Sequence, residues 1–100
     1  TNSYDLISDS LFELDLLAEY IIKYDINILI EGHTDSIGNS NSNLLLSKNR
    51  AQSVYDYLVS KSVKNDQISF KGFGDKVPIS TNNTELGRSL NRRTSFRVVD

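Results

Sequence analysis

Three side chains with catalytic or metal-binding potential, Glu31, His33 and Asp35, alternate along one short segment of the sequence. If the backbone is extended there, alternation places them on one side of the chain. Imidazole and carboxylate groups bind zinc and similar ions, which makes a metal site one interpretation. The chain has one histidine and no cysteine, however, and such a ligand set seldom makes a tight transition-metal site. We therefore expect no metal and no cofactor, and we predict that His33 is a structural residue.

The same histidine and aspartate, with one of the many serines, also raise the possibility of a hydrolase. Nucleophilic catalysis requires a serine positioned beside its base and an oxyanion pocket. The sequence has no Gly-x-Ser-x-Gly motif or comparable context around a serine. A hydrolase that uses His33 and Asp35 therefore rests on residue types alone. By position, Asp35 is explained about as well by capping of a nearby turn as by ligand binding at the end of a strand.

Arg50 is the second unusual residue, because it lies four residues after Leu46 and four before Val54, on or beside an apolar helical stripe. A guanidinium at such a place needs a carboxylate or other acceptors. One interpretation is that the side chain reaches the rim of the core and leaves its head in solvent. The other is that it stands at the mouth of a pocket and presents its planar fork to a carboxylate ligand. Its position alone leaves both interpretations open.

Two amphipathic segments predict the helices that position these residues. Ser10 and Glu13 have the spacing of a capping box, and the apolar pattern that follows predicts a helix to about Tyr24. Apolar residues at helical spacing predict a second helix over residues 43–61. A short helical turn is expected over residues 84–91, with its first residue, a threonine, as the cap.

Three strands complete the predicted fold. They are indicated by β-branched or alternating segments at residues 26–30, 68–73 and 94–99. The polar residues 31–42 are expected to form a loop between the first strand and the second long helix. This alternating order predicts one domain over residues 1–100, an α/β sandwich with two long helices packed on a small mixed sheet. Any strand before the first helix is missing or vestigial in residues 1–6.

Composition and charge narrow the function classes. The chain has 100 residues, of which 38% are hydrophobic and 24% are charged, which fits one globular domain. No apolar run approaches the roughly 20 residues of a membrane span, so we expect no direct membrane insertion. The formal net charge of −2 argues against a dedicated nucleic-acid-binding protein, because such proteins usually carry a strongly basic domain.

Four segments of the sequence resemble the signature of one family, the OmpA-like domains. Residues 32–38 and 43–51 resemble its motifs G-H-T-D-x-x-G and N-x-x-L-S-x-x-R-A. Residues 71–79 and 82–93 are similar to its segment G-Y/F-G-x-x-x-P-I and its ending N-x-T-x-x-G-R-x-x-N-R-R. The order and spacing of the four motifs make the resemblance specific. It implies a β-α-β-α-β-β fold, whose first strand, usually F-x-F-D, has no clear counterpart here.

The resemblance also implies a function: non-covalent, non-enzymatic binding of peptidoglycan through the diaminopimelate residue of its stem peptide. Carried over by position, Asp35 would hold the ammonium group of diaminopimelate and Arg50 its carboxylate. The remaining expected ligand-binding residues are Thr34, which shapes the loop, Asn43, which orders it, Leu46, an apolar wall for the methylene chain, and Arg93, which lines or braces the pocket. The adjacent Arg92 is expected to be structural.

The implied setting is the periplasm, where the domain would anchor an outer-membrane-associated protein to the cell wall. Two alternatives remain open. One is a hydrolase of wall peptides that uses His33 and Asp35. The other is a protein-interaction module that has kept the fold and lost its affinity for peptidoglycan.

Overall fold

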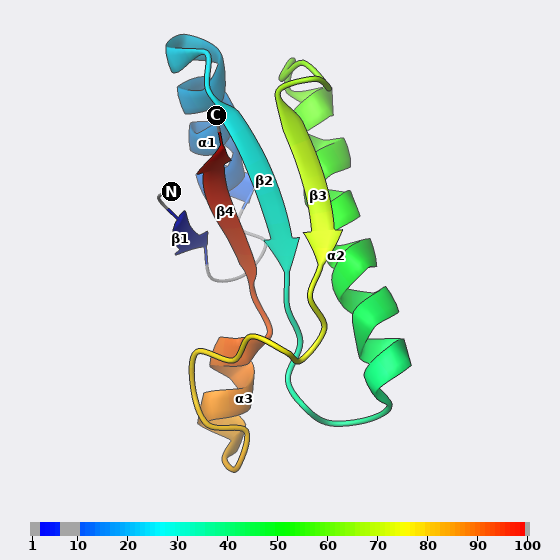
Figure 1. Cartoon of the computed structure of the whole chain (residues 1–100). Coiled ribbons are helices and arrows are strands. Elements are labelled where there is room, and N and C mark those ends of the chain that lie inside the picture. Colours follow the sequence, from blue (N-terminus) through cyan, green and yellow to red (C-terminus); the bar gives the residue numbers. More distant parts are fainter. Residues whose placement is uncertain (1–2, 7–10, 100) are drawn as a thin grey trace.

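The computed structural model describes residues 3–6 and 11–99 of the chain. In order, its helices and strands are β1 (Ser3–Leu6), α1 (Leu11–Tyr24), β2 (Asn27–Gly32), α2 (Ser40–Ser60), β3 (Ile68–Gly72), α3 (Glu85–Asn91) and β4 (Thr94–Val99) (Figure 1). Both long helices, the short helix and the three expected strands are present, so these predictions are confirmed. The predicted capping residue of α1, Ser10, lies outside the described ranges.

Helix α2 begins three residues earlier than the sequence pattern predicted. The cap is Asn39, whose side-chain oxygen accepts hydrogen bonds from the backbone amides of Asn41 at 2.8 Å and Ser42 at 3.2 Å. Asparagine is among the best N-cap residues, because its side chain satisfies amides that the first turn leaves unpaired. The first turn itself contains no apolar residue that could extend the predicted stripe.

In the described part of the chain the sheet is mixed and has four strands, in the order β1-β4-β2-β3. Strands β2 and β3 are parallel, whereas β4 is antiparallel to both β2 and β1. The first strand, which we expected to be missing or vestigial, is present as a four-residue edge strand. A parallel pair needs a crossover connection, and α2 provides it between β2 and β3. The two parallel strands therefore end at the same edge of the sheet.

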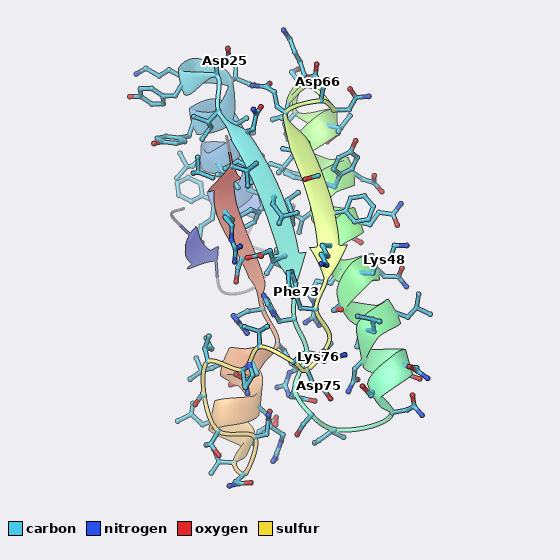
Figure 2. The ribbon with its side chains drawn as sticks, in the orientation of Figure 1. Asp25, Lys48, Asp66, Phe73, Asp75 and Lys76 are labelled. Carbon is cyan, nitrogen blue, oxygen red and sulfur yellow. The ribbon has the colours of Figure 1, made fainter. Side chains whose placement is uncertain are left out.

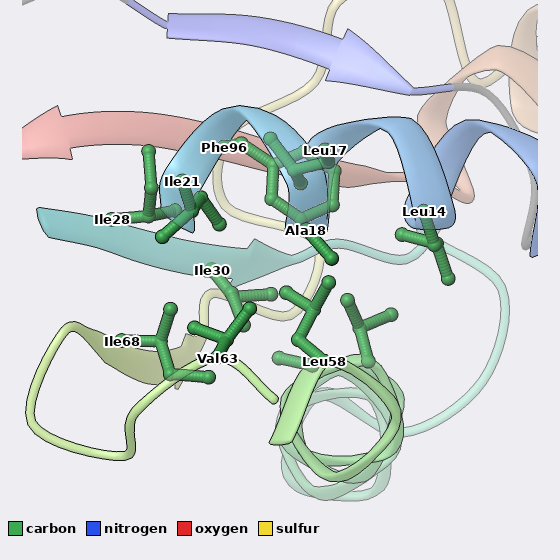
Figure 3. Close-up of a cluster of buried hydrophobic side chains, with 12 residues drawn as sticks. Leu14, Leu17, Ala18, Ile21, Ile28, Ile30, Leu58, Val63, Ile68 and Phe96 are labelled. Atoms are coloured by element: carbon green, nitrogen blue, oxygen red, sulfur yellow. The ribbon is translucent and has the colours of Figure 1, made fainter. Parts of the chain in front are cut away.

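Helices α1 and α2 cover one face of the sheet, and α3 lies beyond the ends of β2 and β3 (Figure 1). The apolar core fills the space between the two long helices and the sheet (Figure 3). Ile21 of α1, Ile30 of β2, Leu58 of α2 and Phe96 of β4 are completely buried there. Each such side chain contributes roughly 1.5–3 kcal/mol through its removal from water. This core holds α2 in place along its second half.

The first half of α2 rests on the sheet by a different kind of contact. A side chain at Gly32 would collide with the backbone carbonyl of Ser47, and one at Gly72 with the backbone of Lys48. The helix backbone therefore lies directly on the ends of β2 and β3, where only glycine leaves room. This half of the helix buries polar residues, including Ser47, while Leu46 is half exposed, a reversal that the apolar pattern did not predict.

A candidate binding site at the carboxyl ends of the parallel strands

The candidate site is formed by the loops that follow β2 and β3 and by the start of α2. In open α/β sheets ligands commonly bind at the carboxyl ends of strands. Phe73, Asp75 and Lys76 mark this end of the sheet in Figure 2, whereas Asp25 and Asp66 mark the opposite end. The sequence-predicted residues of the loop after β2 all lie at the first of these ends.

Asp35 lies in the loop after β2, with its side chain only 12% exposed. One carboxylate oxygen, Oδ1, accepts a hydrogen bond from the backbone amide of Ile37 at 3.0 Å. The other, Oδ2, accepts one from Nη1 of Arg92 at 2.7 Å. Burial raises the pKa of Asp35, but these two hydrogen bonds and the positive charge of Arg92 outweigh it, so the pKa lies below its ordinary value. The site therefore contains a carboxylate that is ionised at neutral pH.

Helix α3 holds the cation that neutralises this carboxylate. The helix begins after Thr84, whose side chain accepts a hydrogen bond from the amide of Gly87 at 3.0 Å, which confirms the predicted cap. Arg92, directly after the helix, forms ion pairs with two carboxylates. Its Nη1 contacts Asp35, and its Nη2 lies 3.2 Å from Oε2 of Glu85. We expected Arg92 to be structural; it is the arginine that contacts Asp35.

Arg50 projects from the middle of α2 toward the same loop. Its Nη1 donates a hydrogen bond of 2.7 Å to the backbone carbonyl of His33, two residues before Asp35. Within residues 3–6 and 11–99, Arg50 forms no ion pair with a carboxylate, in contrast to Arg92 and Arg97. The side chain is half-buried and lines a groove between α1 and α2, so a ligand in that groove can reach it.

Thr34 and Asn43 fix the shape of the loop. Thr34 donates its hydroxyl to the carbonyl of Asp35 at 2.9 Å, and its amide donates to the carbonyl of Gly74 at 2.9 Å. The side-chain amide of Asn43 donates to the carbonyl of Ile37 at 3.0 Å and, more weakly, to that of Asp35 at 3.4 Å. Both side chains are buried. They tie the loop to α2 and to the loop after β3.

Leu46 and Arg50 share a groove of about 440 Å³ between α1 and α2. Apolar side chains from both helices line it, among them Leu14 and Val54. Asp35 does not belong to this lining. Arg50 therefore stands between the groove on one side and the loop that carries Asp35 on the other.

Arg93 lies in another pocket, of about 180 Å³, together with Glu31, His33 and Phe73. It is buried, and its guanidinium donates to the backbone carbonyl of Val77 at 3.0 Å. His33 stacks on Phe73 with ring centroids 5.4 Å apart, and its amide donates to the carbonyl of Arg93 at 2.9 Å. These contacts brace the ends of β2 and β4 rather than line the groove beside Arg50.

Two further features of the described residues bear on function. Among residues 3–6 and 11–99, no three histidine or acidic side chains are grouped so that they could hold a metal ion. None of the helices in these ranges is long and apolar enough to cross a membrane. Glu31 instead pairs with Arg97 at 3.2 Å, on the sheet face opposite the long helices.

The fold and this loop-and-helix site define a domain of the OmpA family. The family model matches residues 1–92, and the chain belongs to this family. The resemblance drawn from the four motifs is thereby confirmed.

Individual relatives support the same assignment. The chain is 41% identical to Outer membrane protein A of Bordetella avium, over 86% of this chain and 45% of that protein. It is 38% identical to the Peptidoglycan-associated lipoprotein of Buchnera aphidicola, over 93% of this chain and 54% of that protein. The chain thus spans about half the length of these two relatives. The crystal structure of the peptidoglycan-associated lipoprotein from Burkholderia pseudomallei superimposes with a TM-score of 0.85 at 27% identity, covering 99% of this chain and 91% of that one.

Proposed function

We propose that this domain binds peptidoglycan non-covalently and without catalysis, by holding a diaminopimelate residue of the stem peptide between Asp35 and Arg50. Membership of the OmpA family and the names of two relatives, both peptidoglycan-associated lipoproteins, support peptidoglycan as the ligand. The domain would act in the periplasm and anchor an outer-membrane-associated protein to the cell wall.

The observation that carries the proposal is the state of Arg50. Its guanidinium is fixed at one nitrogen by the carbonyl of His33 and has no carboxylate partner within residues 3–6 and 11–99. A half-buried arginine in this state is suited to a carboxylate, because its planar fork forms two parallel charge-assisted hydrogen bonds. The ionised Asp35 lies two residues along the same loop from His33. A zwitterion satisfies both charges at once.

The remaining predicted residues have supporting roles in this proposal. Asn43 and Thr34 keep the loop in the conformation that presents Asp35. Arg92 orients the carboxylate through Oδ2, so an incoming ammonium group shares Asp35 with a guanidinium. Leu46, exposed beside Arg50, offers apolar surface to the methylene chain of the ligand. Arg93 acts at a distance, as a brace for the strand ends.

The decisive experiment is calorimetric titration of the domain with free diaminopimelate, with pull-down on purified sacculi as a second readout. We expect Arg50→Ala to weaken binding at least tenfold, because a charge-assisted hydrogen bond contributes about 1.5–3 kcal/mol. Arg50→Lys should recover only part of the affinity, since an ammonium group cannot form the bidentate pair.

Lys48→Ala is the matched control. It removes one positive charge from the exposed side of the same helix and should leave binding unchanged (Figure 2). Undiminished binding by Arg50→Ala would refute the proposed site. Release of muropeptides from the sacculi would favour the hydrolase alternative, and a folded domain that binds neither ligand would favour the interaction module.

A further inference from the structure

Starting from the proposed function, we infer that the groove between α1 and α2 is a second subsite, which binds the peptide residues attached to the diaminopimelate. The occupant is a short extended peptide with small apolar side chains. The inference depends on the groove's length, its lining and its continuity with Arg50.

The groove is much longer than one amino acid. On α2 its lining runs from Leu46 to Tyr57, and at 1.5 Å per helical residue this is a distance of about 16 Å. An extended peptide rises about 3.3 Å per residue, so the groove has room for roughly five residues. Its volume of about 440 Å³ is typical of sites for ligands larger than a single amino acid. A free diaminopimelate molecule at Arg50 would leave most of it empty.

The lining indicates the chemistry of the occupant. Leu14 and Val54 form a buried apolar floor. Leu11 and Leu46 stand on opposite helices and are 57% and 50% exposed, so a ligand between them would remove apolar surface from water. Small apolar side chains, such as the methyl group of alanine, suit this floor.

Polar side chains line one wall of the groove, on α2. Asn49 and Ser53 lie one helical turn apart on the groove side of α2. The carboxamide of Asn49 can both donate and accept a hydrogen bond, as a peptide group does. The hydroxyl of Ser53 already donates to the backbone carbonyl of Asn49 at 3.0 Å, so it offers a ligand its oxygen as an acceptor. An apolar floor beside such a wall matches a peptide backbone with apolar side chains.

The groove is preformed, because its two helices are joined at the far end. The hydroxyl of Tyr57 on α2 donates a hydrogen bond of 2.6 Å to Oδ1 of Asp15 on α1. Lys61 lies 3.8 Å from the same oxygen. A ligand therefore enters a groove whose walls are already fixed in position, and it loses little affinity to reorganisation.

Continuity with the proposed site fixes which peptide occupies the groove. Arg50 lines the groove and, in the proposal above, binds the carboxylate of diaminopimelate. A peptide attached to that residue has its next residues within reach of Leu46 and the apolar floor. The structure thus assigns the groove to the stem peptide rather than to the glycan strand.

The test compares two ligands on two variants. The ligands are free diaminopimelate and a synthetic tetrapeptide that contains diaminopimelate and ends in D-alanine. Ser53→Trp fills the groove, and Gln52→Trp places the same side chain at an exposed position of α2 outside the groove lining. We expect the unmodified domain to bind the tetrapeptide about tenfold more tightly than the free amino acid. Ser53→Trp should abolish that advantage and leave the affinity for free diaminopimelate unchanged, whereas Gln52→Trp should alter neither.

A spectroscopic measurement on the unmodified domain guards against misfolding of the variant. The tetrapeptide should shift the backbone amide signals of Ser53, Val54 and Tyr57, and free diaminopimelate should not. Equal affinity for the two ligands would overturn the groove assignment, and so would tight binding to glycan strands stripped of their peptides. In either case, binding of diaminopimelate would still support the primary site. Tetrapeptide binding that survives Arg50→Ala would instead refute the proposed function.

Discussion

Helix α2 meets the sheet through two different kinds of contact along its length. Its second half places Ala51, Val54 and Leu58 in the apolar core. Its first half buries Asn43 and Ser47 against strand-end glycines and loop carbonyls. Apolar packing stabilises the helix without fixing the position of any polar group. The glycine and hydrogen-bond contacts fix distances closely, and the candidate site lies on that side.

Arg50 stands at the boundary between these two halves. Three residues before it, the hydroxyl of Ser47 donates a hydrogen bond to the carbonyl of Leu44 and accepts one from the amide of Gly74, both at 2.8 Å. Immediately after it, Ala51 is completely buried. The segment that carries Arg50 is thus stabilised by one half of the helix and positioned by the other. Substitutions in the two halves should therefore have separable effects.

The largest effect on stability should come from the apolar half. Leu58→Ala removes a completely buried side chain, and we expect the free energy of unfolding to fall by about 2–5 kcal/mol, as measured by urea denaturation. The affinity of the folded fraction for diaminopimelate should not change. Val59→Ala, at the exposed neighbouring position, is the control and should alter stability by less than about 0.5 kcal/mol. A specific loss of affinity in Leu58→Ala would show that the two halves are not separable.

A smaller loss of stability, accompanied by loss of binding, should come from the glycine contact. In Gly72→Ala the new methyl group meets the backbone of Lys48, and we expect a cost of about 1–3 kcal/mol. Because the start of α2 must move away from the sheet, Arg50 moves with it and diaminopimelate binding should weaken. Ser69→Ala, at an exposed position of the same strand, should affect neither quantity. Retained affinity in a destabilised Gly72→Ala domain would contradict this account of the polar half.

The smallest effect should be a dependence on pH that comes from Asp35. Because its pKa in the folded state is lowered, its ionised form stabilises the fold above the unfolded-state pKa of about 3.9. This contribution is lost as the pH falls through the folded-state pKa. The difference in unfolding free energy between the unmodified domain and Asp35→Asn should therefore decrease below about pH 4. Urea titrations should show a smaller difference at pH 3 than at pH 7. Asp66→Asn, at the opposite end of the sheet, is the control, and a difference independent of pH would contradict the role of Asp35 (Figure 2).

Much of the fold was predictable, because the apolar half of the molecule follows simple periodicities. The stripe of α1 buries Leu14, Leu17 and Ile21 as its spacing indicates. In β4 the alternating pattern correctly marks a strand, with Phe96 facing the core. The start of α2 was missed because a polar first turn carries no hydrophobic period, and only the capping preference of Asn39 gave a local signal.

The candidate site was predictable only where a residue conflicts with its surroundings. Arg50 on an apolar stripe was such a conflict, and the structure brings it to the loop of Asp35. The role of Arg92 gave no such signal. It is adjacent to Arg93, and sequence alone cannot tell which of two neighbouring arginines turns toward the loop after another strand. The answer depends on how α3 ends, with Arg92 as its C-cap.

The bridge from Asp35 through Arg92 to Glu85 connects the candidate site to the exposed surface of α3. Glu85 is exposed on α3 and belongs to neither the loop of Asp35 nor the groove beside Arg50. It nevertheless shares the guanidinium that neutralises Asp35, so replacing it should change how strongly Arg92 competes with the ammonium group in the proposed binding mode. In that mode, ligand affinity can be tuned from a surface position that contacts neither Asp35 nor the groove.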